Sequence, residues 1–275
     1  MNYSPKKMSE LLLENGFRLK KVFGQNFIID ENIINNIIKE AQLDADTLVI
    51  EIGPGAGSLT YKMSSVSGHV LCYEIDKTLE NVLRSTLNGI DNITLKFEDF
   101  LKADIKNDLK NYNFDKIYIV ANLPYYITTP IIMKLIEDEI DIDKIVIMVQ
   151  KEVGNRFKAI PGSKDYSSLS VFLNYYFNVR KLLDVSKNVF IPKPNVDSIV
   201  IEFSKKVGLV NLKNRDLFFK LIRDSFKQKR KTLRNNLKEY DLEKIAEVLK
   251  KYNFDLSVRA EQLGIEVFID LSNEL

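Results

Sequence analysis

Four consecutive residues near the middle of the chain, Asn122-Leu123-Pro124-Tyr125, combine an amide side chain, a rigid turn and an aromatic ring. The side-chain oxygen of Asn122 and the backbone carbonyl of Leu123 are two acceptors that can hold both hydrogens of an amino group. Adenine N6 is a poor nucleophile because its lone pair is delocalised into the ring, and such acceptors would favour a pyramidal nitrogen. Pro124 would stiffen the turn, and Tyr125 would stack on a flipped base. The segment predicts chemistry at adenine N6; a proline turn with interface aromatics is the alternative.

A glycine-rich segment, EIGPGAG at residues 51–57, directly follows the apolar run TLVI and precedes a stretch of helical pattern. Glycines in a strand-to-helix turn let the backbone approach a nucleotide-like ligand closely, because a Cβ there would collide with it. The dinucleotide pattern G-x-G-x-x-G fails, since its third glycine position, counted from Gly53, is Ser58. The spacing of Gly53, Gly55 and Gly57 instead resembles the cofactor loop of class I S-adenosylmethionine methyltransferases. A glycine turn without a ligand is the alternative.

Acidic residues follow the next two apolar runs. Glu74 lies 21 residues after Gly53, and at the end of a second strand it could accept hydrogen bonds from both hydroxyls of a ribose. Asp99 could accept a hydrogen bond from the adenine amine of the cofactor, with Ile75 or Phe100 against the ring; helix capping is its competing role. Because the carboxyl ends of parallel strands share one edge of a sheet, these residues predict one cofactor pocket.

Short apolar runs alternate with stretches of helical length, which predicts parallel strands joined by crossover helices. The runs expected to be strands are TLVIEIG, HVLCYEID, ITLKFED, KIYIVAN and KIVIMVQ. SLSVFLNYYF (168–177) and VDSIVIEF (196–203) follow without an obvious long helix between them, so we expect them to form an antiparallel pair that closes the sheet. The predicted fold is α/β, with a Rossmann-like methyltransferase sheet.

Helical periodicity dominates the last quarter of the chain. We expect a small all-helical domain at residues 208–275, with Asp241 capping one helix and a last helix near 261–274. The sheet domain would span residues 1–207 and include a basic segment, 1–30, which carries FGQNFIID and ends on Asp30 as a helix cap.

Composition excludes several classes of site. Cys72 is the one cysteine and His69 the one histidine, so neither an internal disulfide nor a His/Cys zinc site can form, and we expect no metal. The longest apolar runs are far shorter than the roughly 20 residues of a membrane span, and the N-terminus MNYSPKKMSE lacks a signal-peptide core. We expect a cytoplasmic protein and, by default, a monomer.

Taken together, the motifs resemble those of the KsgA/RsmA family, the small-subunit (16S) ribosomal RNA adenine N6-dimethyltransferases. The segments that carry the resemblance are FGQNFIID, VIEIGPGAGSLT, YEID, EDFL, NLPYYITTPII, FIPKPNVDS and SFKQKRKTLRNNL. The resemblance implies S-adenosylmethionine as cofactor and dimethylation of N6 on two adjacent adenines in a hairpin near the 3′ end of small-subunit RNA. A role as a checkpoint in ribosome small-subunit biogenesis is implied as well.

The resemblance also implies roles for individual residues. The cofactor positions that it carries over are Asn26, Ile28, Gly53, Glu74, Asp99 and Asn122. Phe190, in FIPKP, would form a second wall against the target base. Ile28 stands where many members have leucine, which is a mild departure because only a backbone contact is expected there. Two alternatives stay open: an Erm-type 23S ribosomal RNA methyltransferase that confers antibiotic resistance, and a non-catalytic RNA-binding assembly factor.

A basic run with no acidic residue extends from Lys227 to Arg234, although the net charge of the whole chain is only +2. Helical spacing would place Lys227, Lys231 and Arg234 on one face, with Arg230 beside them. Such a face would contact RNA phosphates and give salt-dependent affinity without reading the base sequence. A solvated helix face is the alternative.

Overall fold

The computed structural model describes residues 10, 12, 14, 25–124 and 127–275. Its contacts divide the chain into two compact units, one of residues 1–154 with 180–204 and the other of residues 155–179 with 205–275. Within the described ranges no helix is long and apolar enough to cross a membrane.

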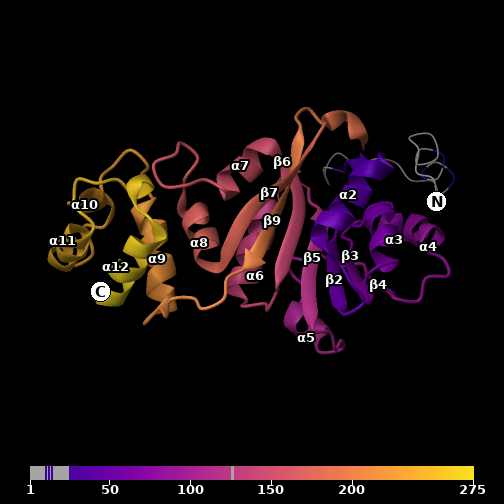
Figure 1. Ribbon diagram of the computed structural model, residues 1–275, viewed down its shortest axis with the longest axis horizontal. Helices are drawn as coiled ribbons and strands as arrows, with labels where there is room; N and C mark the ends of the chain where they lie inside the picture. The colour runs from indigo at the N-terminus through magenta and orange to yellow at the C-terminus, as the bar shows by residue number, and fades with distance from the viewer. Residues whose placement is uncertain (1–9, 11, 13, 15–24, 125–126) are drawn as a thin grey trace. The chain divides into compact units, whose positions relative to one another are not determined.

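The first unit is built on a seven-stranded sheet in the described part of the chain, in the order β4-β3-β2-β5-β6-β9-β7 (Figure 1). These strands are β2 (Thr47–Ile52), β3 (His69–Tyr73), β4 (Ile93–Lys96), β5 (Lys116–Asn122), β6 (Lys144–Gln150), β7 (Phe177–Val185) and β9 (Ser198–Lys205). Strands β2 to β6 are parallel, and β9 runs antiparallel to β6. This mixed sheet with its connecting helices is the predicted α/β fold.

Helices of the first unit connect the strands and cover the sheet. They are α2 (Glu31–Ala41), α3 (Ser58–Ser64), η2 (Lys77–Leu79), α4 (Glu80–Thr86), α5 (Ile105–Leu109), α6 (Thr128–Glu137), α7 (Lys151–Phe157, whose end enters the second unit) and η3 (Lys187–Val189). Asp30 caps α2 as predicted, because its carboxylate accepts from the backbone amides of Asn32 and Ile33. The helix buries Ile34, Ile37 and Ala41 in the core beneath it.

A topological switch point lies between β2 and β5. The chain leaves β2 for β3 and β4 on one side and returns to β5 on the other side of β2. In a sheet wound in this way, the loops at the carboxyl ends of the strands diverge at the switch point and leave a crevice for a ligand. The two-stranded pairing of β1 (Phe27–Ile28) with β8 (Phe190–Ile191) holds the chain that precedes α2.

The predicted strand at 168–177 is wrong. Residues Ser168–Tyr176 form helix α8, and the strand beside β9 begins only at Phe177. Aromatic and β-branched residues favour strands only weakly compared with tertiary packing. Here a capping box between Ser167 and Ser170 starts the helix, and Phe172 stacks on Phe219 with ring centroids 4.8 Å apart.

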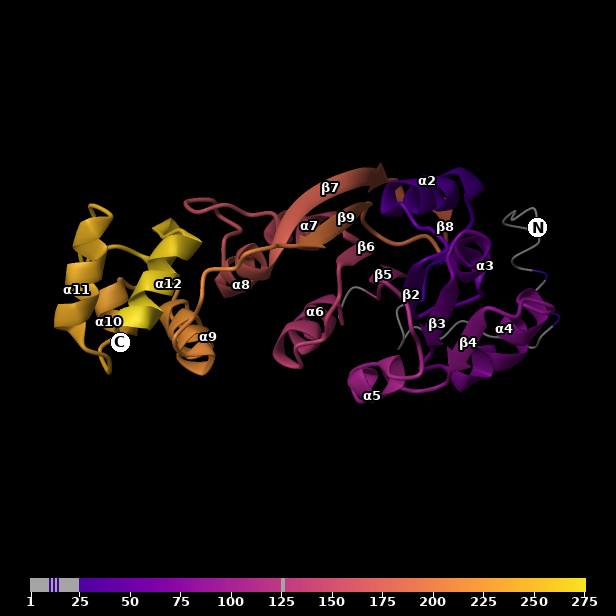
Figure 2. The same ribbon diagram turned by 60° about the horizontal axis from the view of Figure 1, so that its bottom comes forward.

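The described elements that lie wholly within the second unit are helical. They are α8, α9 (Arg215–Ser225), α10 (Leu233–Asn236), α11 (Leu242–Lys251), η4 (Ala260–Gln262) and α12 (Ile265–Glu274), of which α9 to α12 are yellow to orange in Figure 2. Asp241 caps α11 as predicted. The helical unit therefore includes residues 155–179, which the domain boundary expected at residue 207 assigns to the sheet domain.

Candidate active site

A cavity of about 310 Å³ lies at the carboxyl ends of the strands in the first unit, within the size range of small-molecule sites. The predicted cofactor and catalytic residues that line it are Asn26, Ile28, Gly53, Gly55, Glu74, Ile75, Asp99, Phe100, Asn122, Leu123 and Pro124. Strand ends β2, β3 and β5 meet there because these strands are hydrogen-bonded neighbours around the switch point. Residues from separate sequence motifs thus lie in one place.

The glycine loop after β2 adopts a backbone that side chains rarely allow. Gly53 and Gly55 have φ angles of 71° and 61°, in the left-handed region that favours glycine. A Cβ on Gly55 would lie 3.0 Å from the ring of Phe27, a distance that real Cβ atoms seldom show. Glycine at this position therefore serves both the turn and the close packing of residue 27 against the loop.

Glu74 is buried, with 5% of its surface exposed, and its carboxylate is held by backbone amides. The amide of Gly55 donates to one oxygen at 3.2 Å, and the amide of Asp76 donates to the other at 2.8 Å. Burial raises the pKa of Glu74 to about 7, although these two hydrogen bonds act in the opposite direction. The side chain is thus fixed at the cavity wall with both oxygens oriented.

Glu51, at the end of β2, is a second buried carboxyl on the cavity and was not among the predicted site residues. Thr60 Oγ1 donates to it at 2.5 Å, and the buried Cys72 thiol lies 3.7 Å from the same oxygen. Burial raises the pKa of Glu51 to about 8, and the neighbouring charge of Glu74 adds to this. Its position as the acidic residue two places before Gly53 is the sequence signal that could have identified it.

Four carboxyl groups line the cavity, from Glu51, Glu74, Glu98 and Asp99, and its described lining includes no Lys, Arg or His. Burial raises the pKa values of Glu51 and Glu74, and a cation that enters the cavity would favour their ionised forms because it stabilises the charge. The lining is therefore suited to a ligand that carries positive charge.

Asp99 and the two candidate packing residues, Ile75 and Phe100, belong to the same lining. One Asp99 oxygen accepts from the amide of Leu101 at 3.0 Å within a turn, and the next helix, α5, is capped by Asp104, so Asp99 does not have the helix-capping role that was its alternative. Phe100 is 4% exposed and packs edge-on to Tyr73, whereas Ile75 is 49% exposed. Ile75 therefore offers the more open apolar surface for a flat ring.

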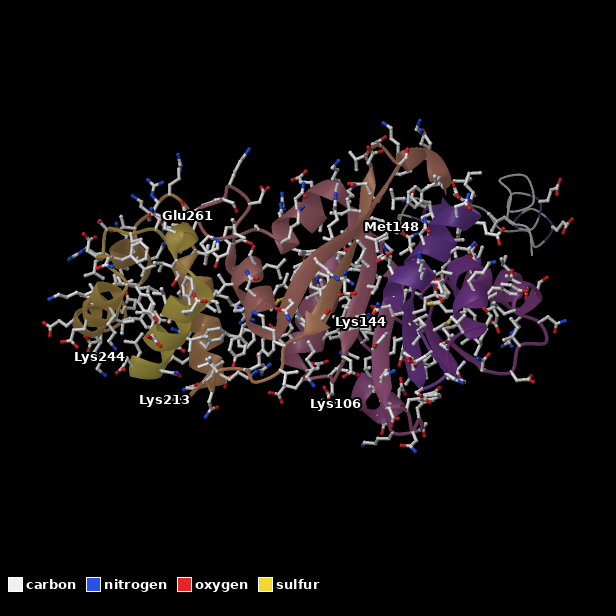
Figure 3. All side chains as sticks on the ribbon, viewed as in Figure 1. Lys106, Lys144, Met148, Lys213, Lys244 and Glu261 are labelled. Atoms are coloured by element: carbon white, nitrogen blue, oxygen red, sulfur yellow. The ribbon has the colours of Figure 1, made fainter. Side chains whose placement is uncertain are left out.

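Asn122 ends β5, and its amide is oriented by the segment before α2. Asn122 Nδ2 donates to the backbone carbonyl of Asn26 at 2.9 Å. Since the nitrogen of the planar amide is held there, the oxygen Oδ1 points to a different side and can accept. The next residue, Leu123, donates its amide to the carbonyl of Met148 on β6, a residue labelled in Figure 3. The strand end is thereby fixed before the turn at Pro124.

One predicted catalytic residue, Phe190, is not part of this lining. Phe190 is 2% exposed and belongs to the core cluster that contains Ile28 and Ile34, so the structure does not bring its ring to the cavity. Tyr125 lies outside the described residues.

The predicted helical face at residues 227–234 is wrong, because α9 ends at Ser225 and α10 begins at Leu233. Asn236 ends α9 by donating its side-chain amide to the carbonyls of Ser225 and Gln228. Lys227, Arg230, Lys231 and Arg234 are nevertheless all exposed. The cations lie mostly on a turn between two helices rather than on one helix.

Comparisons with known proteins agree with this geometry. Residues 16–275 match the model of a family described as ribosomal RNA adenine dimethylase. The chain is 47% identical, over 98% of its length and 94% of the relative, to the ribosomal RNA small subunit methyltransferase A of Staphylococcus aureus strain bovine RF122 / ET3-1. Among solved structures, a dimethyladenosine transferase from Plasmodium falciparum matches with a TM-score of 0.74 at 26% identity, covering 89% of this chain and 95% of that one. The 23S rRNA methyltransferase ErmE matches with a TM-score of 0.70 at 24% identity, covering 90% and 99%, and shows the fold alone.

Proposed function

The chain belongs to the ribosomal RNA adenine dimethylase family, and we propose that it methylates N6 of two adjacent adenines in a 3′-terminal hairpin of small-subunit (16S) ribosomal RNA, with S-adenosylmethionine as the methyl donor. One observation carries the proposal: the Asn122-Leu123-Pro124 strand end opens on the same cavity as the glycine loop and Glu74. A base amine and a cofactor could therefore meet at one place.

The residues of the cavity fit this cofactor. S-adenosylmethionine, when bound, supplies a methyl group on a positively charged sulfur. The carboxyls of Glu51 and Glu74 suit the positive charge of such a ligand, and Glu74 would accept hydrogen bonds from its ribose hydroxyls. At Gly53 no heavy atom lies within 4 Å of the place where a Cβ would stand, which leaves the backbone there open to close approach. Ile75 and Phe100 would flank the adenine ring of the cofactor, and Asp99 would accept from its amine.

Asn122 and Leu123 would act on the target base. Asn122 Oδ1 and the carbonyl of Leu123 accept the two N6 hydrogens and orient the nitrogen lone pair toward the methyl group. These acceptors are held by the protein before the reaction, so their orientation costs no rearrangement during it. Holding both reactants in line supplies much of the remaining rate. Tyr125 remains the candidate to stack on the flipped base.

The decisive experiment is to incubate the protein with isotopically labelled S-adenosylmethionine and with under-methylated small or large ribosomal subunits, and then to map N6-dimethyladenine. We expect label in two adjacent adenines near the 3′ end of small-subunit RNA. Label in the large subunit alone would establish the Erm-type activity instead. Binding of small subunits without any label would establish the non-catalytic assembly role.

We propose that the basic turn of the second unit, which carries Lys227, Arg230 and Lys231, binds RNA phosphates. Reversing the charges of Lys227, Arg230 and Lys231 to Glu should weaken binding to small subunits and flatten its dependence on salt, because each lost phosphate contact removes roughly 0.7 to 0.9 from the slope of log K against log salt. Binding measured between 50 and 200 mM salt, roughly the range in which this effect is large, would show it.

Reversal of Lys238, Lys244 and Lys250 is the matched control, since these exposed lysines belong to the same unit and their reversal changes the net charge equally. Lys244 is labelled in Figure 3. Equal salt slopes for both triple variants would remove the basic turn from the RNA interface.

The proposed partner is ribosomal RNA within the small subunit or its precursor, and this substrate supports a cytoplasmic location. We propose that the protein acts as a monomer, which light scattering of the purified chain would test directly.

A further inference from the structure

A segment of four residues, 25–28, contacts three of the strand ends that form the cavity. Gln25 reaches the loop after β3, the carbonyl of Asn26 reaches the end of β5, and the ring of Phe27 packs against Gly55 after β2. This segment, which belongs to none of the three strand ends, thus joins the cofactor-binding part of the site to the base-binding part.

The contact of Gln25 is a tether to a buried carboxylate. Gln25 Nε2 donates to Asp76 Oδ2 at 3.0 Å, and Asp76 is 2% exposed. The other oxygen of Asp76 accepts from the amide and hydroxyl of Thr78 at 3.1 and 2.6 Å, so this carboxylate is fixed from both sides. A hydrogen bond to an ionised, partly buried acceptor is among the stronger ones that proteins make.

Asn26, the next residue, contacts the side-chain amide of Asn122, so the position of Gln25 affects the orientation of that amide. Asn26 follows Gln25 directly, and its carbonyl receives Nδ2 of Asn122. If residue 26 shifts, its carbonyl no longer selects which end of the amide faces the base. A rotated amide would present hydrogens to the N6 amine where an acceptor is required.

We propose, on the basis of the function proposed above, that Gln25 is a positioning residue for methyl transfer: anchored on Asp76, it holds the Asn26 carbonyl where it orients the Asn122 amide. The residue acts through Asn122 and does not accept the base hydrogens itself. Glu74 keeps its own contacts to the amides of Gly55 and Asp76, so the carboxylate proposed to bind the cofactor ribose does not depend on the tether.

Replacement of Gln25 by leucine tests this role. We expect kcat for methylation of small subunits to fall about 10- to 100-fold, as expected when a reacting group is misplaced by a fraction of an ångström to an ångström. The dissociation constant of S-adenosylmethionine, measured by calorimetry, should change far less than kcat, because the contacts of Glu74 are kept and the main loss is of an effect on the transition state. Lys116→Met, which removes the ion pair with Asp44 elsewhere in the first unit, is the control for loss of a tether.

A donor–acceptor exchange separates positioning from a general loss of structure. Gln25→Glu places two carboxylates together and should lower kcat at least as much. Adding Asp76→Asn to this variant restores the hydrogen bond with its direction reversed, and we expect kcat to recover to within about threefold of wild type, as for coupled neighbours in a double-mutant cycle.

The possible outcomes distinguish this inference from the proposed function. Absence of methylation by the wild-type protein would refute the proposed function. An active wild type with unchanged kcat in Gln25→Leu would refute the positioning role alone. A weaker cofactor affinity with kcat intact at saturation would show direct cofactor contact and also refute it. A lowered melting temperature in Gln25→Leu that the double variant Gln25→Glu/Asp76→Asn does not restore would also refute the positioning role.

Discussion

Replacing Asn122 by alanine is expected to lower kcat at least about 100-fold, in the range found when one fixed polar group that acts on the transition state is removed. The variant retains Glu74, the glycine loop and the rest of the cavity, so its affinity for S-adenosylmethionine should stay largely intact and fall far less than kcat, although Asn122 is also one of the cofactor positions. The expected pattern is therefore a large loss of kcat with cofactor binding largely kept. Single-turnover methylation of small subunits and calorimetric titration of the cofactor measure the two quantities separately.

Asn111→Ala is the matched control, since it makes the same change at an exposed position of the first unit. Asn122→Asp is informative as well. It keeps an acceptor but loses the Nδ2 group that donates to the Asn26 carbonyl. A carboxylate oxygen of residue 122 would then face the carbonyl oxygen of Asn26. We expect it to be impaired. Near-normal kcat in Asn122→Ala would mean that another group holds the amine of the base.

Replacing Glu74 by alanine is expected to weaken binding of S-adenosylmethionine about 100-fold or more. The variant loses charge-assisted hydrogen bonds to the ribose, which contribute about 1.5 to 3 kcal/mol each. A tenfold change in affinity corresponds to about 1.4 kcal/mol, so the loss of two such bonds gives this factor. Titration calorimetry gives the affinity directly. Glu80→Ala, on the exposed surface of α4, removes the same charge from the same unit and should leave the affinity unchanged.

The raised pKa of Glu74 adds a pH dependence with a definite sign. In the free protein the carboxyl is half protonated at a pH of about 7, and only the ionised form can accept from both ribose hydroxyls. Cofactor affinity should therefore rise as the pH rises through about 7 and fall as the pH is lowered below it. Glu74→Gln should bind weakly and show a smaller change across this range. An affinity of the wild type that does not vary with pH would contradict the ribose role of the ionised carboxylate.

The strand-end motifs could be recognised from the sequence because each is local. A parallel strand, its terminal residues and the turn that follows are contiguous, so EIGPGAG, Glu74 in CYEID and Asn122 in NLPY each identify one strand end. The alternation of strands and helices then places these ends at one edge of a sheet. The cavity contains the predicted cofactor residues of these strand ends for this reason, and the segment before α2 adds Asn26 and Ile28 to its lining.

Two sequence predictions, the strand at 168–177 and the helical face at 227–234, are wrong because contacts with distant residues outweigh the local preference for secondary structure. Residues 168–177 have the composition of a strand, yet α8 forms because Phe172 can stack on Phe219, 47 residues later in the chain. The basic run has helical spacing, yet α9 ends at Ser225, whose carbonyl accepts from the Asn236 side chain. Neither contacting residue, Phe219 or Asn236, can be predicted from the sequence of the segment that it contacts.

The sequence by itself determined the family, the α/β sheet and which residues stand at the strand ends of the site, because strand order and local motifs fix them. Only the tertiary structure decided how those residues are held. It buried Glu51 and Glu74 and so raised their pKa values, and it packed Phe190 into the core instead of the cavity. It also joined Gln25 to Asp76 and Asn26 to Asn122 across 51 and 96 positions, respectively. Burial and long-range hydrogen bonds depend on the packing of the whole unit, which no single segment encodes.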